Sequence, residues 1–233
     1  MAGGRMTLVG KGHKQSVKPV NVHIVKGKRS LASKVPSKMP KKMRVKLPYT
    51  AQISMGNGTL TAEKYIFRMN SLLDPDLTDT GNQPAGFDEY AALYECYKVL
   101  NSSIEVTWYA PINSATSGAM VLTVAPTTDP SPTNRNAAGV LVLNRVKHAF
   151  CGPSDGSHGI KTVRNKGAPY TVLGLKKDVL ELSALNAANP AQQAYWWINL
   201  AIADASTAVI TTDLIVKVVY DVEFTDRIDL SLS

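Results

Sequence analysis

The 233-residue sequence is poor in cysteine and histidine and contains no long apolar run. Its two cysteines, Cys96 and Cys151, cannot build a disulfide framework and lack C-x-x-C spacing, so we expect them to be small buried side chains. No stretch approaches the roughly 18 apolar residues of a membrane-spanning helix. The first residues also lack the apolar core of a secretory signal. A disulfide-stapled protein and a helical membrane protein are therefore not expected.

Motifs of catalysis are missing as well. Residues 154–158 supply serine, aspartate and histidine, but neighbours on one loop rarely converge as nucleophile, base and orienting group, and no G-x-S-x-G motif frames them. Asp74, Asp76 and Asp79 could offer oxygen ligands to Ca²⁺, but they lack EF-hand spacing, and turn or cap roles fit them better. We therefore predict no enzymatic activity, no cofactor and no metal site.

Acidic residues are absent from the first 47 positions, and this absence is the first functional signal in the sequence. Thirteen of the 26 lysines and arginines lie there, while the rest of the chain carries thirteen basic residues and all 18 acidic ones. A leader of charge +13 thus precedes a body of charge −5. Like charges repel, and the leader has too few apolar residues to bury a core. We therefore divide the chain into a basic N-terminal arm, 1–46, and a body domain, 47–233.

The cations of the arm are the candidate functional residues. Their number suits sequence-independent binding of nucleic acid through phosphate neutralisation and counterion release. No aromatic residue precedes Tyr49, so base stacking is not indicated, and the arm has only three arginines for bidentate base contacts. The predicted nucleic-acid-binding residues are Lys11, Lys14, Lys18, Lys26, Lys28, Arg29, Lys34, Lys38, Lys41, Lys42, Arg44 and Lys46.

Other roles for the arm stay open at this point. It could be a solubilising tail, or a nuclear-localisation signal centred on residues 41–44 (KKMR), and a localisation role is compatible with nucleic-acid binding. Attraction to an anionic membrane is less well supported, because no amphipathic apolar face accompanies the charge.

The body is predicted to consist mainly of short strands. Alternating or wholly apolar runs occupy 49–55, 59–70, 99–109, 119–125, 160–164, 170–175, 194–203 and 214–224. Gly56-Asn57-Gly58 is a strong turn signal between the first two runs. Two short helices are indicated, one from the spacing of aromatic residues over 87–97 and one from a capping box at 178–181, ended by Pro190. Residues 140–146 fit either a strand or a helix. Eight or more strands without β-α-β alternation predict an all-β fold, an antiparallel sandwich or jelly roll.

Trp196 and Trp197 are neighbours on the predicted strand 194–203, so they point to opposite faces of its sheet. One of them belongs in the core. The other lies either at a subunit contact, where aromatic residues are enriched, or beneath another part of the same subunit.

The body also resembles a known family. In order, residues 47–53 (LPYTAQI), 65–76 (YIFRMNSLLDPD), 80–84 (TGNQP) and 86–90 (GFDEY), then Tyr94 and Tyr97, resemble segments of the capsid proteins of small circular Rep-encoding single-stranded DNA viruses, the circovirus-like group. Residues 189–195 (NPAQQAY) are similar to a segment that precedes the penultimate strands of those proteins. The resemblance covers residues 44–226 and is weakest over 127–160.

This resemblance implies a single jelly roll of eight strands in two four-stranded sheets. It also implies a non-enzymatic virion protein that self-assembles as about sixty copies into a T=1 icosahedral shell around single-stranded DNA, with assembly in the host nucleus. Sixty arms would bring roughly 780 positive charges to the enclosed phosphates.

Two alternatives remain. A capsid protein of a small positive-strand RNA virus fits as well, because charge recognises phosphate rather than sugar. A cellular nucleic-acid-binding β-sandwich is the other, and it would stay a monomer or a small oligomer.

Overall fold

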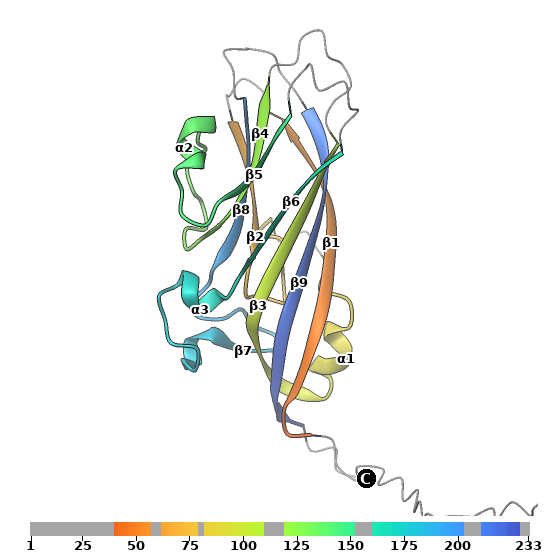
Figure 1. Ribbon diagram of the computed structural model, residues 1–233. Helices are drawn as coiled ribbons and strands as arrows, with labels where there is room; N and C mark the ends of the chain where they lie inside the picture. Colours follow the sequence, from red (N-terminus) through yellow and green to blue (C-terminus); the bar gives the residue numbers. More distant parts are fainter. Residues whose placement is uncertain are drawn as a thin grey trace, which may run out of the picture. The chain divides into compact units, whose positions relative to one another are not determined.

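The computed structural model describes residues 40–56, 62–78, 82–109, 119–151, 160–202 and 211–228 (Figure 1). All of these residues belong to one compact unit that begins at Pro40. The predicted turn residues Asn57 and Gly58 lie outside the described residues. None of the described helices is long and apolar enough to cross a membrane.

The eight longer strands pair as if the chain were folded double. The antiparallel pairs are β1 (Met43–Gly56) with β9 (Thr211–Arg227), β2 (Ala62–Arg68) with β8 (Tyr195–Ile202), β3 (Tyr94–Tyr109) with β6 (Ile160–Gly167), and β4 (Met120–Thr127) with β5 (Lys147–Cys151). First pairs with last, second with penultimate, and so on inward, which is the nesting of a jelly roll. The predicted all-β jelly roll is therefore confirmed.

These strands form two sheets. The first sheet has the order β1-β9-β3-β6, and the three-residue strand β7 (Ser183–Leu185) also pairs with β3. The second sheet has the order β2-β8-β4-β5. In β9, buried and solvent-facing residues alternate, as expected for a strand with one face on the core. Its buried side chains include the predicted inward set, Val216, Val218, Tyr220, Val222 and Phe224.

The outer face of the second sheet is covered within the same subunit. Helix α2 (Ala137–Leu141) packs on β4 and β8, and every residue of β8 is buried. Trp197 packs on this outer side with Ile66 and Val140, whereas Trp196 points into the main core. Both tryptophans are thus covered within the subunit, which decides between the two alternatives for Trp197. On the first sheet the outer side chains are more exposed, as at Ile215 and Lys217 of β9.

The predicted helix over 87–97 is wrong beyond its first turns. Helix α1 (Phe87–Ala91) ends early, and Tyr94 already belongs to β3. The rings of Tyr90 and Tyr94 nevertheless lie 5.2 and 6.1 Å from the ring of Phe224 on β9. Tyr90 of helix α1 and Tyr94 of strand β3 therefore belong to one aromatic cluster in the folded protein. Their spacing in the sequence resembles that of a longer helix although they lie on two different elements.

The segment after β6 also differs from the prediction. Residues 170–175, expected to be a strand, contain most of helix α3 (Pro169–Val172). Proline is preorganised for the first helical position, and Gly174, with φ of 70°, takes the left-handed conformation that commonly follows a helix.

The capping box at 178–181 does not form either. The 3-10 turn η1 (Leu180–Leu182) begins without a side-chain cap and leads straight into β7. In the ambiguous stretch 140–146, the chain finishes α2 at Leu141 and begins β5 only at Lys147. Asn136 caps α2 by accepting a hydrogen bond from the Gly139 amide at 2.9 Å.

The tryptophan pair supplies a test of how the two sheets are joined. The Trp196 indole donates to the Ser102 hydroxyl of the opposite sheet at 2.8 Å, whereas the buried Trp197 indole nitrogen has no hydrogen-bond partner among the described residues. Trp196→Phe should lower the free energy of unfolding by about 1–3 kcal/mol more than Trp197→Phe, because only the first leaves a buried hydroxyl unpaired. Urea unfolding of the monomeric protein measures the difference. Equal losses of unfolding free energy in the two variants would contradict a stabilising Trp196–Ser102 hydrogen bond.

Candidate nucleic-acid interface

The predicted binding residues of the arm fall into two groups. Lys11, Lys14, Lys18, Lys26, Lys28, Arg29, Lys34 and Lys38 lie outside the described residues. Lys41 and Lys42 directly precede β1, and Arg44 and Lys46 lie within it. The first strand therefore includes residues 43–46, which were assigned to the arm from the sequence.

Two of these cations bind carboxylates of the protein itself. Arg44 forms a bidentate ion pair with Asp221 on β9, with Nε 2.7 Å from Oδ1, and Lys42 lies 3.2 Å from Glu223. The hydrogen bond from Arg44 lowers the pKa of Asp221, because it stabilises the charged carboxylate. Lys42 and Arg44 therefore tie the last residues of the arm, 40–46, to β9. We call these residues the arm root. The proposed localisation stretch, 41–44, overlaps this anchored segment.

A further contact fixes the start of the described chain. The Tyr94 hydroxyl, at the beginning of β3, donates to the Pro40 carbonyl at 2.9 Å. The point at which the arm joins the body is thus held by three strands, β1, β3 and β9.

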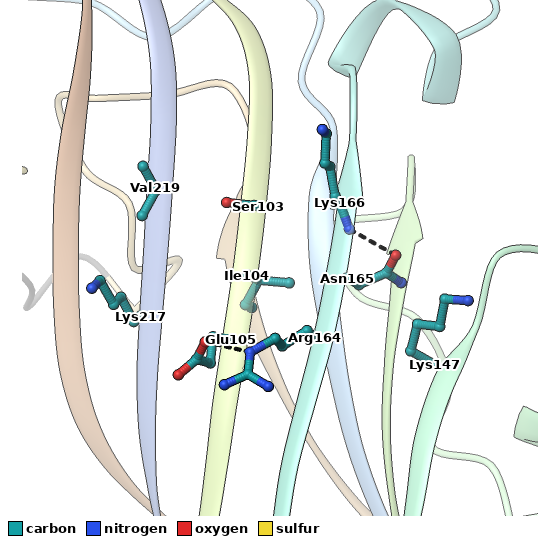
Figure 2. A pocket seen from close by; sticks show the side chains of 9 residues that line it. All are labelled: Ser103, Ile104, Glu105, Lys147, Arg164, Asn165, Lys166, Lys217 and Val219. Carbon is teal, nitrogen blue, oxygen red and sulfur yellow. Dashed lines mark hydrogen bonds and ion pairs between the residues drawn. The ribbon is translucent and has the colours of Figure 1, made fainter.

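A basic groove crosses the first sheet (Figure 2). It has a volume of about 510 Å³ and runs from β9 over β3 and β6 of the first sheet to β5, which belongs to the second sheet. Its lining residues are Ser103, Ile104, Glu105, Lys147, Arg164, Asn165, Lys166, Lys217 and Val219. With four cations and one carboxylate, the lining carries a charge of +3.

The cations of this groove are not equivalent. Arg164 is paired with Glu105, with Nε 2.6 Å from Oε2, so their charges compensate each other. The ammonium groups of Lys147, Lys166 and Lys217 are exposed and make no hydrogen bond or ion pair within the part of the chain that the structure describes. These three groups are therefore available to an anion.

The sequence contained only a weak signal for this groove. On β6, Arg164 and Lys166 alternate with the buried Val163 and Asn165. This is the pattern of a strand with one face in solvent and the other in the core. Lys217 interrupts an otherwise apolar run at an outward position. On β3, Glu105 pairs with Arg164 of β6 on one side and with Lys217 of β9 on the other, so these two cations are brought together only by the folded sheet.

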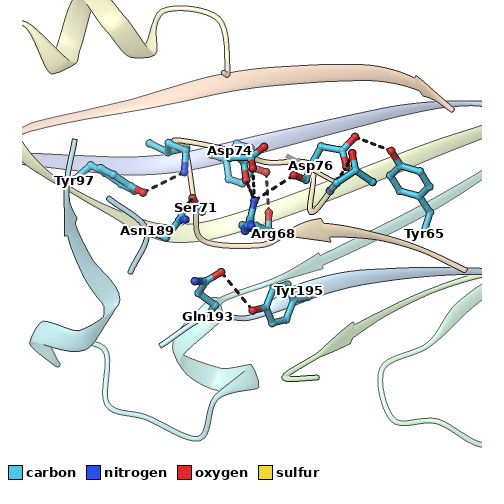
Figure 3. Close-up of polar contacts among 12 residues, drawn as sticks. Tyr65, Arg68, Ser71, Asp74, Asp76, Tyr97, Asn189, Gln193 and Tyr195 are labelled. Carbon is cyan, nitrogen blue, oxygen red and sulfur yellow. Dashed lines mark hydrogen bonds and ion pairs between the residues drawn. The ribbon is translucent and has the colours of Figure 1, made fainter. Parts of the chain in front are cut away.

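The aspartates considered as Ca²⁺ ligands organise a turn after β2 (Figure 3). Asp74 accepts a hydrogen bond from the buried Arg68 at 2.6 Å. Asp76 accepts from the Tyr65 hydroxyl at 2.7 Å and from the amide and hydroxyl of Thr78. These are turn and packing roles, as the sequence favoured. Asp79 lies outside the described residues, and the described ones contain no cluster of three or more potential metal ligands.

The remaining candidate reactive groups carry little chemistry. The whole serine, aspartate and histidine cluster at 154–158 lies outside the described residues, as does the side chain of Cys151. Cys96 is a free, partly buried cysteine, and burial is the main cause of its raised pKa. Its reactive thiolate form is therefore disfavoured.

Comparison with solved structures finds viral capsid proteins. Cocksfoot mottle virus matches with a TM-score of 0.48 and 10% identity, covering 80% of this chain and 96% of that chain. The 60-mer of BFDV capsid protein matches with a TM-score of 0.46 and 13% identity, covering 84% and 100%. Desmodium yellow mottle tymovirus matches with a TM-score of 0.41 and 12% identity, covering 99% and 100%. No protein-family model and no curated protein matches the sequence.

The anchoring pair at the arm root predicts a defined pH dependence. The folded-state pKa of Asp221 lies below its ordinary value of 3.8, so its contribution to stability is present above about pH 4 and is lost as the pH falls through the folded pKa. Arg44→Gln should therefore lower the urea midpoint near pH 6, and its difference from the natural protein should shrink towards pH 3.

Lys41→Gln is the matched control, because it removes a nearby exposed cation outside the ion pair with Asp221. Its effect should show no such convergence at low pH. A deficit of Arg44→Gln that stays constant or grows on acidification would contradict the assignment.

Proposed function

We propose that this chain is a viral capsid protein that self-assembles into a closed icosahedral shell and packages single-stranded DNA through its basic N-terminal arm. One observation carries the proposal: a jelly-roll body follows a segment of 47 residues that holds thirteen cations and no anion. Jelly rolls serve as shell subunits and also as lectin and cupin domains. A strongly cationic leader favours the first of these, because a shell that encloses a polyanion needs countercharge.

The surface of the body supports contacts between copies. Large apolar side chains are exposed at Val142, Phe150, Leu180 and Leu185, where 78%, 47%, 80% and 59% of their surface is accessible. Apolar groups exposed on one subunit are stabilised when another subunit covers them. Self-association into about sixty copies would use such positions repeatedly under a single symmetry.

The choice of DNA as cargo rests on the resemblance of residues 47–110 and 165–226 to circovirus-like capsid proteins. The arm itself recognises phosphate and is indifferent to sugar, so a capsid of a positive-strand RNA virus would use the same chemistry. Digestion of the packaged polymer with DNase or RNase separates these two cargoes. Assembly in the host nucleus is part of the proposal, with the basic residues before Pro40 as the signal, since Lys42 and Arg44 are tied to β9.

Assembly is the first property to test. Purified full-length protein should sediment as particles of roughly 1.5 MDa, the mass of about sixty 25.1 kDa copies, and appear as closed shells by negative-stain electron microscopy. A cellular nucleic-acid-binding module would instead stay a monomer or small oligomer at every salt and protein concentration, and that result would overturn the capsid proposal.

Packaging of nucleic acid by the arm is the second property to test. Deleting residues 1–39 removes nine cations but keeps the Pro40 and Lys42 contacts, so shells should form with β structure intact and a greatly reduced ratio of absorbance at 260 to 280 nm. A full-length variant with the same nine residues changed to glutamine controls for arm length and should behave alike. Shells of either variant with undiminished nucleic acid would contradict the role of the arm.

A further inference from the structure

The basic groove of the first sheet stands out against the charge of the body. Beyond residue 47 the chain has thirteen basic and 18 acidic residues, yet four of those basic residues and only one acidic residue line the groove. An even spread of charge would give the groove a negative balance. The lining is therefore a local concentration of positive charge on an otherwise acidic domain.

The groove lies where a long polymer can reach it. Its lysines come from β9, β6 and β5, and each is exposed to solvent. The outer face of the second sheet, by contrast, is occupied by α2 and its neighbours. Figure 2 shows Lys217 at one end of the lining residues and Lys147 at the other, with the Glu105–Arg164 pair between them.

The chemistry of the lining points to phosphate. Ammonium groups are compact point charges that suit phosphate oxygens, and the hydroxyl of Ser103 adds a neutral hydrogen-bonding group. Among the described residues no aromatic ring lines the groove, so the described lining offers bases no stacking platform. The groove thus suits a nucleic-acid backbone without regard to sequence.

We propose that this groove binds the phosphate backbone of packaged single-stranded nucleic acid, with Lys147, Lys166 and Lys217 as its contacts. The proposal rests on the proposed packaging function and extends it, because it gives the folded body its own contact in addition to the arm.

The position of the groove relative to the arm root favours joint action. Lys42 pairs with Glu223, and Lys217 lies six residues before Glu223 on β9, which corresponds to about 20 Å of strand. Nucleic acid held at the arm root would therefore lie within about 20 Å of the groove along the same strand. One strand can contact both, and the two contacts then reinforce each other.

Chemical protection provides the direct test. Full-length protein is acylated with an amine-reactive reagent, with and without an oligodeoxythymidine of about 30 nucleotides, long enough to span the arm root and the groove, and each lysine is quantified by mass spectrometry. Lys147, Lys166 and Lys217 should react at least about threefold less when the oligonucleotide is bound, because phosphates cover their ammonium groups. Lys176 and Lys177, exposed on the loop after α3, are the internal controls and should be unchanged.

A matched pair of variants makes the test quantitative. For single strands the slope of log K against log salt changes by about 0.7 for each phosphate that the protein no longer neutralises, so Lys166→Gln with Lys217→Gln should reduce its magnitude by about 1.4. Lys176→Gln with Lys177→Gln removes the same charge and should leave the slope as it was.

The possible failures are distinct. Equal reactivity of the groove lysines with and without oligonucleotide, or an unchanged slope, would overturn the groove while leaving shell assembly and arm-dependent packaging intact. Protection that appears in nucleic-acid-free shells would also overturn it, and would mean that an acidic surface of a neighbouring subunit fills the groove.

Discussion

The pairing of β1 with β9 joins the two ends of the folded body over fourteen residues, from Met43 opposite Phe224 to Gly56 opposite Thr211. The other three nested pairs lie between these two strands in the sequence, so this pair encloses all of them along the chain. It also fixes where the arm begins. Arg44 and Lys42 bind Asp221 and Glu223 across the pair, and the same strand β9 carries Lys217 into the basic groove. The pairing register of β1 with β9 therefore sets both the ion pairs at the arm root and the strand that carries Lys217.

The two sheets divide their tasks because their outer faces differ. The outer face of the second sheet is apolar, with Val121, Ala125 and Trp197 buried under α2 and its flanking residues, so it contributes to the core. The outer face of the first sheet is polar and open. Near the arm root its carboxylates are paired with Lys42 and Arg44, whereas in the groove three of the four cations are left without a carboxylate partner among the described residues. That face is thus basic at the groove because three of the groove cations have no carboxylate partner among the described residues, whereas the carboxylates near the arm root are neutralised by Lys42 and Arg44.

Much of the fold was predictable because a strand with one buried face has a period of two. The alternation in 214–224 and the apolar run 119–125 identified β9 and β4 with no structural information. The helices were not predictable in the same way. Tyr90 and Tyr94 are spaced as on a helix but meet at Phe224 from two different elements, and Pro169 begins a helix inside a segment of strand-forming residues. The groove could not be predicted from the sequence, because Arg164 and Lys217 come together only where both strands pair with Glu105 on β3.

The opposite signs of the arm and the body are compatible with a single polyanionic partner. At about 0.1 M salt, charges separated by more than roughly 10 Å are largely screened, so the net charge of −5 on the body has little effect on an anion held close to the groove. What such an anion experiences is the local lining of +3, with Lys147, Lys166 and Lys217 within reach. Within the described body, β9 carries both the carboxylates that pair with Lys42 and Arg44 and the groove residue Lys217.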